Sequence, residues 1–89
     1  MAHMLVTHSV DDFDKWKAVF DEVKPMRDEA GELSVALFRD ASEPDTITAL
    51  FEWDSLDNAR EYAGSDRLKA AMQKAGVSGP PTISFLNAG

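Results

Sequence analysis

The spacing of hydrophobic residues changes along this chain from a strand pattern to a helix pattern. Residues 4–10 alternate weakly and are rich in β-branched side chains, which predicts a first strand. Asp11 and Asp12 end that strand and can cap a following helix. Apolar side chains then recur every three or four residues, which predicts an amphipathic helix. They are Phe13, Trp16, Val19, Phe20 and Val23.

Pro25 interrupts this helical pattern. Proline lacks an amide donor, and its ring crowds the preceding turn of a helix. We therefore expect either a break near Lys24 or a kink, followed by a short last piece that runs to Ala30. Gly31 is a natural C-terminal cap for that piece.

Two strands are predicted next, over residues 33–40 and 46–53. Residues 41–45 contain proline and acidic side chains and read as the hairpin loop between them. One face of the first strand should carry Leu33, Val35 and Leu37. Large apolar side chains occur on both faces of these strands, although a sheet with one face in water should alternate more cleanly.

The last third of the chain repeats the order of helix and strand. A second helical region should begin after residues 54–55, break at residues 64–66 and end at Gly76. The Gly-Pro-Pro run at residues 79–81 is predicted to form a stiff entry to a final strand over residues 82–86.

The resulting order predicts an α+β fold of the ferredoxin-like βαββαβ type, a four-stranded antiparallel sheet with helices on one face. The free face would measure on the order of 400 Å², from roughly 3.3 Å per residue and 4.8 Å between strands. Because this face carries large apolar side chains, we expect two copies to pack their free faces together as a homodimer.

Length and composition limit the organisation of the chain. Eighty-nine residues with 44% hydrophobic content can bury one modest core, so residues 4–89 are predicted to form a single domain. Residues 1–3 resemble a vector-derived extension ahead of a native start at Met4. Cysteine is absent, and no apolar run approaches the roughly 20 residues that cross a bilayer. These features favour a cytoplasmic protein that has no membrane partner.

The formal net charge of −7 limits the kinds of partner that this protein can bind. Such a charge repels nucleic acid and anionic lipid over the surface as a whole. Nucleic acid is therefore not expected as a partner.

Four segments of the sequence resemble the dimeric α/β-barrel superfamily, and in particular short bacterial proteins labelled as cyclases or as antibiotic-biosynthesis-monooxygenase-like. The segments are residues 12–17 (DFDKWK), 24–27 (KPMR), 51–56 (FEWDSL) and 71–81 (AMQKAGVSGPP). The resemblance covers nearly the whole chain from Met4. It implies a dimeric α/β barrel with a pocket between sheet and helices or at the barrel mouth.

The resemblance spans several activities, including cofactor-free oxygenases, polyketide cyclases and heme degraders. Heme-degrading members use a histidine on a helix, whereas the one histidine after Met4 in this chain, His8, lies on the first predicted strand. No cofactor is therefore expected. A metal site is not expected either, because one histidine among scattered carboxylates has no recognisable ligand spacing.

His8 and Glu52 are the candidate catalytic residues. Histidine transfers protons near neutral pH without special tuning, and the strand neighbours Val6 and Val10 could place His8 in a cavity. The alternative is a packed histidine in the interior or at an interface. Burial of Glu52 would raise its pKa and make it an acid or base, whereas the alternative is an ion pair with Arg39 or Arg60 at the sheet edge or at an interface.

Aromatic side chains are the candidates for ligand binding. A flat apolar ligand could lie among Phe38, Trp53, Tyr62 and Phe85. At helix and strand spacing, such residues can equally form the core. Tyr62 and Arg27 are possible polar groups of such a pocket, with surface positions as the default.

The sequence leaves two functions open. One is a cofactor-independent monooxygenase or cyclase that acts on an aromatic or polyketide-like small molecule. The other is a noncatalytic binding or accessory module that uses the same cavity or only its dimer surface. A pocket that contains His8 or Glu52 would favour the enzyme.

Overall fold

The computed structural model describes residues 2–88. Its elements follow in the order β1 (Ala2–Val10), α1 (Phe13–Glu22), α2 (Lys24–Ala30), β2 (Glu32–Arg39), β3 (Thr46–Trp53), α3 (Leu56–Ala63), α4 (Asp66–Ala75) and β4 (Val77–Asn87). Each predicted helical region is a pair of helices in line. With each pair counted once, the predicted ferredoxin-like βαββαβ order is confirmed.

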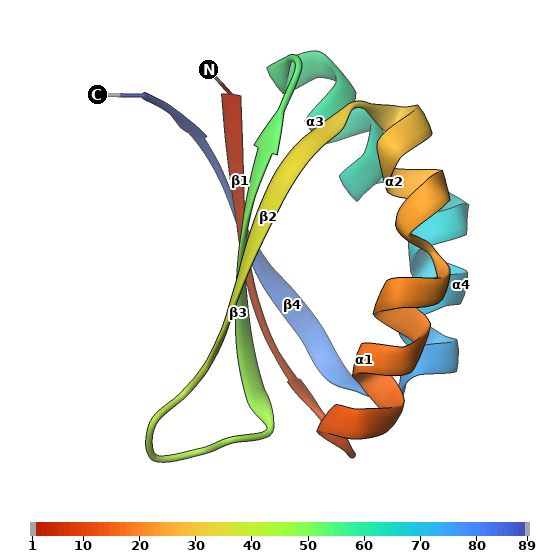
Figure 1. Cartoon of the computed structure of the whole chain (residues 1–89), viewed down its shortest axis with the longest axis vertical. Coiled ribbons are helices and arrows are strands. Elements are labelled where there is room, and N and C mark those ends of the chain that lie inside the picture. The colour runs from red at the N-terminus through yellow and green to blue at the C-terminus, as the bar shows by residue number, and fades with distance from the viewer. Residues whose placement is uncertain (1, 89) are drawn as a thin grey trace.

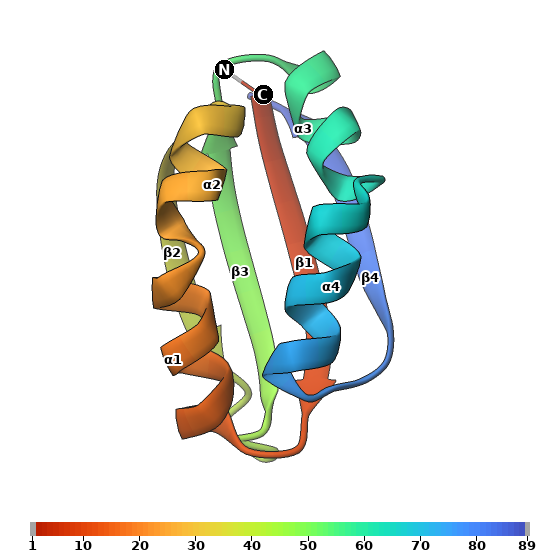
Figure 2. The same cartoon turned by 90° about the vertical axis from the view of Figure 1, so that its right-hand side faces the viewer.

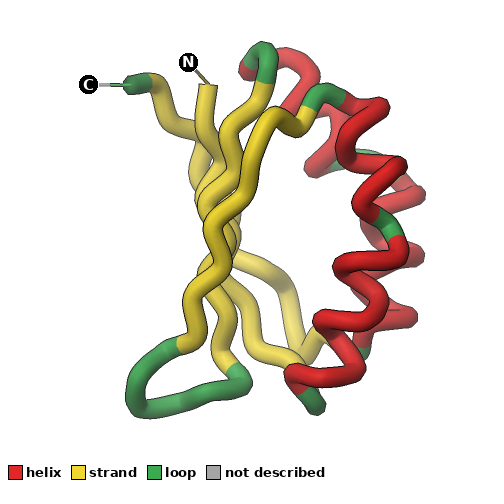
Figure 3. The backbone as a smooth tube through the Cα atoms, in the orientation of Figure 1, coloured by secondary structure: helices red, strands yellow, loops and turns green. Residues whose placement is uncertain are grey.

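The molecule has two layers (Figures 1 and 3). The sheet is antiparallel with strand order β2-β3-β1-β4, and all helices lie on one of its faces. Figure 2 shows α1 and α2 over the β2 and β3 side and α3 and α4 over the β1 and β4 side. The other face of the sheet is left without a helical cover.

Local signals determine where the helices start and stop. The Asp12 side chain caps α1 by accepting a hydrogen bond from the Asp14 amide at 2.9 Å. Pro25 lies in the first turn of α2, where its missing N–H costs no hydrogen bond. The predicted break near Lys24 is therefore confirmed. Gly31 ends α2 with φ of 123°, a conformation that favours glycine.

The core lies between the layers and follows the alternation of the central strands. On β3, the side chains that face the helices are buried, and they are Ile47, Ala49, Phe51 and Trp53. On β1, Met4, Val6 and Val10 face the same way. Helix α1 covers them with Trp16 and Val19, both almost fully buried. The helical stripe predicted for α1 therefore faces the sheet.

Strand β4 begins earlier than predicted. It starts at Val77, and the proline pair expected to precede it lies inside the strand. Because β4 is an edge strand, proline removes no ladder bond on its free side. Its pairing with β1 shifts register between Thr7 and Ser9, close to those prolines.

Strand β2 differs from the predicted face pattern. Its register against β3 shifts between Glu32 and Ser34, and Glu32 takes the inward position beside Trp53. Leu33, which was predicted to face the core with Val35 and Leu37, is consequently 54% exposed. A one-residue shift in pairing turns a strand side chain to the opposite face.

Strand β1 begins at Ala2, two residues before the predicted start. Ala2 is buried and pairs with Trp53 and Asn87. Ala2 and His3, which look vector-derived, are thus part of the sheet. Their assignment to a vector remains a prediction.

Candidate functional site

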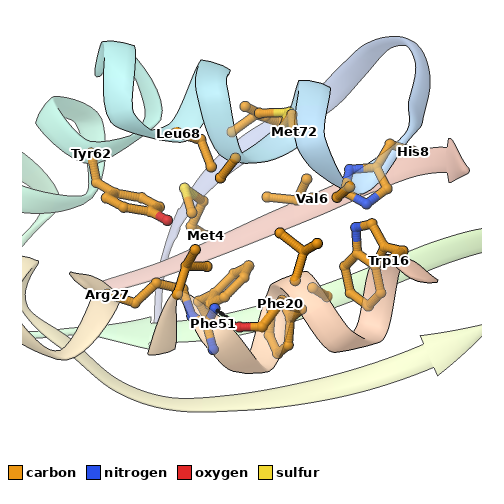
Figure 4. Close-up of a pocket in the computed structure, with 16 residues that line it drawn as sticks. Met4, Val6, His8, Trp16, Phe20, Arg27, Phe51, Tyr62, Leu68 and Met72 are labelled. Atoms are coloured by element: carbon orange, nitrogen blue, oxygen red, sulfur yellow. Dashed lines mark hydrogen bonds between the residues drawn. The ribbon is translucent and has the colours of Figure 1, made fainter. Parts of the chain in front are cut away.

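A narrow cavity of about 60 Å³ lies between the helices and the sheet. Strands β1, β3 and β4 form its floor, and all four helices contribute side chains to its walls. The wall is apolar, although three polar residues take part in the lining, namely His8, Arg27 and Tyr62. Figure 4 shows His8 near Trp16 at one end and Arg27 and Tyr62 toward the other.

His8 reaches this cavity because it lies on the helix-facing side of β1, the same side as Val6 and Val10. Its ring contacts Trp16 edge-on, with ring centroids 5.6 Å apart. The residue is partly exposed, yet both ring nitrogens are shielded from solvent and have no hydrogen-bond partner among the described residues. Buried polar atoms are normally paired, so a ligand that contacts this ring could pair with either nitrogen.

Burial also sets the protonation state of His8. Desolvation disfavours the imidazolium and lowers the pKa of His8 from its usual value. The ring is therefore neutral at neutral pH, and one of its nitrogens can accept a proton. A neutral imidazole in an apolar cavity has the properties of a general base.

Tyr62 lies at the opposite end of the cavity on α3. It packs against Trp53, with ring centroids 5.2 Å apart, and its hydroxyl points toward the cavity (Figure 4). Burial raises the pKa of Tyr62, so the hydroxyl remains protonated. It is available as a hydrogen-bond donor.

Arg27, which the sequence suggested as a possible polar group of a pocket, lines this cavity. It is 3% exposed, and its Nε donates to Glu32 Oε1 at 2.8 Å. Its Nη1 donates to the Phe20 carbonyl at 2.6 Å, and the guanidinium lies 3.7 Å from the centre of the Phe20 ring. Burial raises the pKa of Glu32, and Arg27 opposes that rise. The default assignment of Arg27 to the surface is therefore wrong.

The position of Arg27 in the sequence held one signal of this burial. Arg27 follows Phe20 by seven residues, which continues the apolar stripe of α1 across Pro25. A buried arginine needs a partner, and Glu32 is the nearby carboxylate on the next strand. The Arg27–Glu32 ion pair could not be predicted from the spacing of the two residues in the sequence. The register shift of β2 against β3 determines which way the Glu32 side chain points.

A second, open hollow of about 350 Å³ lies outside the cavity, between α2 and α3. Its rim is polar and carries Glu29, Asp54, Asn58, Glu61, Ser65 and Arg67. Tyr62 borders both spaces. The outer hollow and the cavity therefore adjoin at Tyr62.

The other predicted site residues do not meet at the cavity. Trp53 is fully buried in the core and lies outside the cavity lining. Phe85 packs against the same core, and the guanidinium of Arg60 lies 5.6 Å from the centre of its ring. Phe38 is 57% exposed. The structure thus brings together His8 and Tyr62 from the predicted set.

Glu52 lies on the face of the sheet that the helices leave free. It alternates with the buried Phe51 and Trp53, and its carboxylate is 3.8 Å from His3 Nε2. Among the described residues, Glu52 makes no ion pair with Arg39 or Arg60, and such a pair across an interface stays a prediction. Arg39 instead donates to the Pro44 carbonyl and stacks on Phe13.

Residues 2–88 contain no group of three side chains placed to share a metal ion. The chemistry available at the cavity is instead a neutral imidazole, a protonated phenol and a paired guanidinium around an apolar space. Such a set can take a proton from a bound organic molecule and donate hydrogen bonds to the resulting anion.

Comparison with known proteins identifies the family. The model of the antibiotic biosynthesis monooxygenase family matches residues 1–74. The chain belongs to this family. The antibiotic biosynthesis monooxygenase resemblance predicted from the sequence is thereby confirmed. No curated protein gives a significant match.

Solved structures agree on the fold. A structure from Bordetella bronchiseptica, described as a candidate antibiotic biosynthesis monooxygenase, is 18% identical with a TM-score of 0.80 and covers 98% of this chain and 95% of that one. One from Caulobacter crescentus with the same description is 26% identical, with a TM-score of 0.75 and coverage of 98% and 88%. SnoaB from Streptomyces nogalater, described as a cofactor-independent oxygenase, is 12% identical, with a TM-score of 0.77 and coverage of 98% and 91%.

Proposed function

We propose that this protein is a cofactor-independent monooxygenase or cyclase that acts on an aromatic or polyketide-like small molecule, with His8 as the general base. One observation carries the proposal. The neutral His8 ring, whose two buried nitrogens have no partner among residues 2–88, borders an apolar cavity in a chain of the antibiotic biosynthesis monooxygenase family. The neighbour SnoaB is described as a cofactor-independent oxygenase, which supports the same reading.

Both reactions begin with the same step. His8 removes a proton from a carbon that is acidic because it lies next to a carbonyl group or between aromatic rings. In a cyclase, the carbanion adds to a carbonyl group of the same molecule. In an oxygenase, it adds to dioxygen, the resulting peroxide anion takes the proton back from the His8 imidazolium, and the hydroperoxide so formed loses water. The net change is a CH₂ group plus O₂ to a carbonyl group plus water, so no external reductant is needed.

The size of the cavity indicates how the substrate enters. A cavity that holds benzene measures about 150 Å³, more than twice the 60 Å³ found here. A ring compound must therefore displace side chains, and the lining offers flexible ones in Met4, Leu68 and Met72. The outer hollow beside Tyr62 is the natural side of entry, because Tyr62 borders both spaces.

Hydrogen–deuterium exchange of an acidic ketone tests the proposed step. We expect the protein to accelerate loss of the methylene proton signal of 2-tetralone in D₂O under nitrogen, because His8 would remove and return that proton. The His8→Gln variant should exchange at the rate of buffer alone. His3→Gln is the matched control, since His3 lies on the free face of the sheet, and it should exchange like the parent.

The alternative function, a noncatalytic binding module, predicts different results in the exchange experiment and in NMR spectra of His8. In a noncatalytic binding module, 2-tetralone or 1-naphthol would shift the NMR signals of the His8 ring without any exchange above buffer. Exchange that survives His8→Gln in a folded variant would remove His8 as the base. Neither exchange nor shifted signals would leave the cavity without a ring ligand and contradict the proposal.

We further propose that the protein is a homodimer joined through the free faces of two sheets. Leu5 and Leu50 are paired neighbours on that face, and Leu86 and Phe38 are 41% and 57% exposed. Contact between two such faces would hide these side chains from water. Light scattering at micromolar concentration should give twice the chain mass of 9.8 kDa. A persistent monomer would contradict this arrangement.

The proposed setting is the cytoplasm, with a small apolar or aromatic molecule as the partner and no nucleic acid. Among residues 2–88, no helix has the length and hydropathy needed to cross a bilayer. The absence of cysteine suits a reducing compartment. A net charge of −7 favours a neutral or weakly acidic ligand over a strongly anionic one.

A further inference from the structure

His8 lacks the hydrogen-bond partner that usually orients a histidine base. In such bases, a carboxylate or a backbone carbonyl accepts a hydrogen bond from one ring nitrogen and fixes the ring. Neither ring nitrogen of His8 has a partner among residues 2–88, and burial rather than a neighbouring charge lowers the pKa of His8. The orientation of the imidazole beside the cavity therefore depends on its packing contacts.

Trp16 makes a directional contact with this ring. The ring centroids are 5.6 Å apart and the ring planes meet at 68°, so one ring presents its edge to the other. Figure 4 shows the nitrogen of the Trp16 indole on the side that faces His8. The edge of an aromatic ring carries partial positive charge, and an N–H group adds to it. Trp16 therefore turns a positive edge toward the His8 ring without occupying either of its nitrogens.

The indole is itself held by aromatic neighbours one turn before and one turn after it on α1. Its ring centroid lies 6.0 Å from that of Phe13 and 4.9 Å from that of Phe20. Each of these rings in turn contacts a guanidinium, that of Arg39 at 3.9 Å from the centre of Phe13 and that of Arg27 at 3.7 Å from the centre of Phe20. Contacts of both kinds are directional. This chain of contacts fixes the direction in which the edge of Trp16 points.

We infer that Trp16 is the positioning residue of His8, which orients the imidazole at the cavity and favours its neutral form. The inference rests on the proposed function, in which His8 is the general base, and assigns to an indole the part that a carboxylate plays in other histidine bases. The electrostatic effect has the opposite sign. A carboxylate stabilises the imidazolium, whereas a positive edge disfavours it. His8 thus remains a proton acceptor at lower pH, and its imidazolium returns the proton more readily.

An isosteric replacement of the indole tests this inference. The amino acid 3-benzothienylalanine has the shape of tryptophan with sulfur in place of the N–H group, and amber suppression can introduce it in place of Trp16. Because the positive edge is weakened, we expect the pKa of His8 in the free protein to rise by about 0.5–1 pH units, as followed by NMR. The acid limb of the pH profile of 2-tetralone exchange should move to higher pH by the same amount.

Trp53 supplies the matched control. Its Nε1 is also buried without a partner among residues 2–88, but Trp53 lies outside the cavity lining. The same analogue in place of Trp53 should leave the pKa of His8 and the pH profile unchanged. If the protein with the analogue in place of Trp16 does not fold, Trp16→Phe keeps an aromatic ring without the N–H group and should raise the pKa of His8 in the same direction.

The outcomes separate this inference from the proposed function. An unchanged pKa of His8 in the folded Trp16 variants would overturn the inference, as would an equal rise from the analogue in place of Trp53. Exchange that requires His8 but keeps its pH profile in the Trp16 variants would support the proposed function and overturn the inference. A raised pKa of His8, in a protein whose parent does not exchange 2-tetralone, would support the contact and contradict His8 as the base.

Discussion

Replacing Arg27 by methionine is expected to lower the free energy of unfolding by about 3–5 kcal/mol at pH 7, as for other buried ion pairs that lose one partner. Arg27 and Glu32 are both nearly inaccessible to solvent, with side chains 3% and 2% exposed. Removing Arg27 leaves the Glu32 carboxylate buried without its counter-charge and frees the Phe20 carbonyl. Urea unfolding of both proteins measures the difference.

The loss should depend on pH in a defined direction. Burial raises the pKa of Glu32, and without Arg27 that rise is larger, so the folded variant holds a proton that the unfolded chain releases. Stability of the variant then falls as the pH rises above the ordinary glutamate value of 4.5. Below that value both states are protonated, and the loss should shrink. An equal loss of unfolding free energy at acidic and neutral pH would indicate that the variant is destabilised by lost packing and not by the unpaired Glu32 charge.

Two variants serve as controls for this prediction. Lys24→Met removes an exposed ion pair with Asp28 on the same helix and should cost about 1 kcal/mol or less. Replacing Arg27 by Met and Glu32 by Leu together should recover much of the single-variant loss, because no buried charge remains. A double variant that is less stable than the single one would mean that the pair itself stabilises the fold.

Trp16→Ala is expected to cost about 3–5 kcal/mol, the usual range for deleting a buried large aromatic side chain. Trp16 is 4% exposed, stacks on Phe20 and contacts the His8 ring. The substitution would also open the cavity end to water, so the pKa of His8 should return toward its ordinary value of 6.5. Thermal unfolding and NMR titration of His8 measure the two effects.

Lys15→Ala is the matched control for Trp16→Ala. Lys15 is the preceding residue on α1 and is exposed, so its removal should change the free energy of unfolding by about 0.5 kcal/mol or less. A Trp16→Ala variant as stable as Lys15→Ala would show that Trp16 contributes little packing. An unchanged pKa of His8 would show that other side chains shield its ring.

The helices were predictable because their signals are local. The stripe of α1, its Asp12 cap, the break at Pro25 and the turn at Gly31 depend on residues within a few positions of one another. Strand β3 was predicted over its full length, Thr46–Trp53. Its alternation of buried and partly buried side chains is unbroken, and a hairpin loop and a helix cap bound it.

The ends and registers of the other strands were not predictable in this way. Pro80 and Pro81 read as an entry loop, yet pairing with β1 draws them into β4. Leu33 read as core, yet the shift beside Ser34 turns it outward. Pairing depends on a partner strand distant in sequence, so a single segment does not contain the information.

The same contrast between local signals and long-range pairing applies to the candidate site residues. His8 could be proposed from its chemistry and from the apolar neighbours Val6 and Val10. Glu52 could be proposed in the same way, although it lies on the other face of the sheet. Arg27 was named as a possible pocket residue but assigned to the surface by default, because its burial depends on Glu32, which a register shift in β2 turns inward.

By itself, the sequence determined the order of elements, the helix boundaries and the ferredoxin-like fold, since these follow from local periodicity, capping and chain order. Only the tertiary structure decided which polar residues share a space. The packing of α1 and α4 over β1 and β3 leaves His8 unpaired in an apolar cavity, with Tyr62 at its other end. Burial, desolvation and the pKa of a side chain depend on every element packed around it, so they exist only in the folded chain.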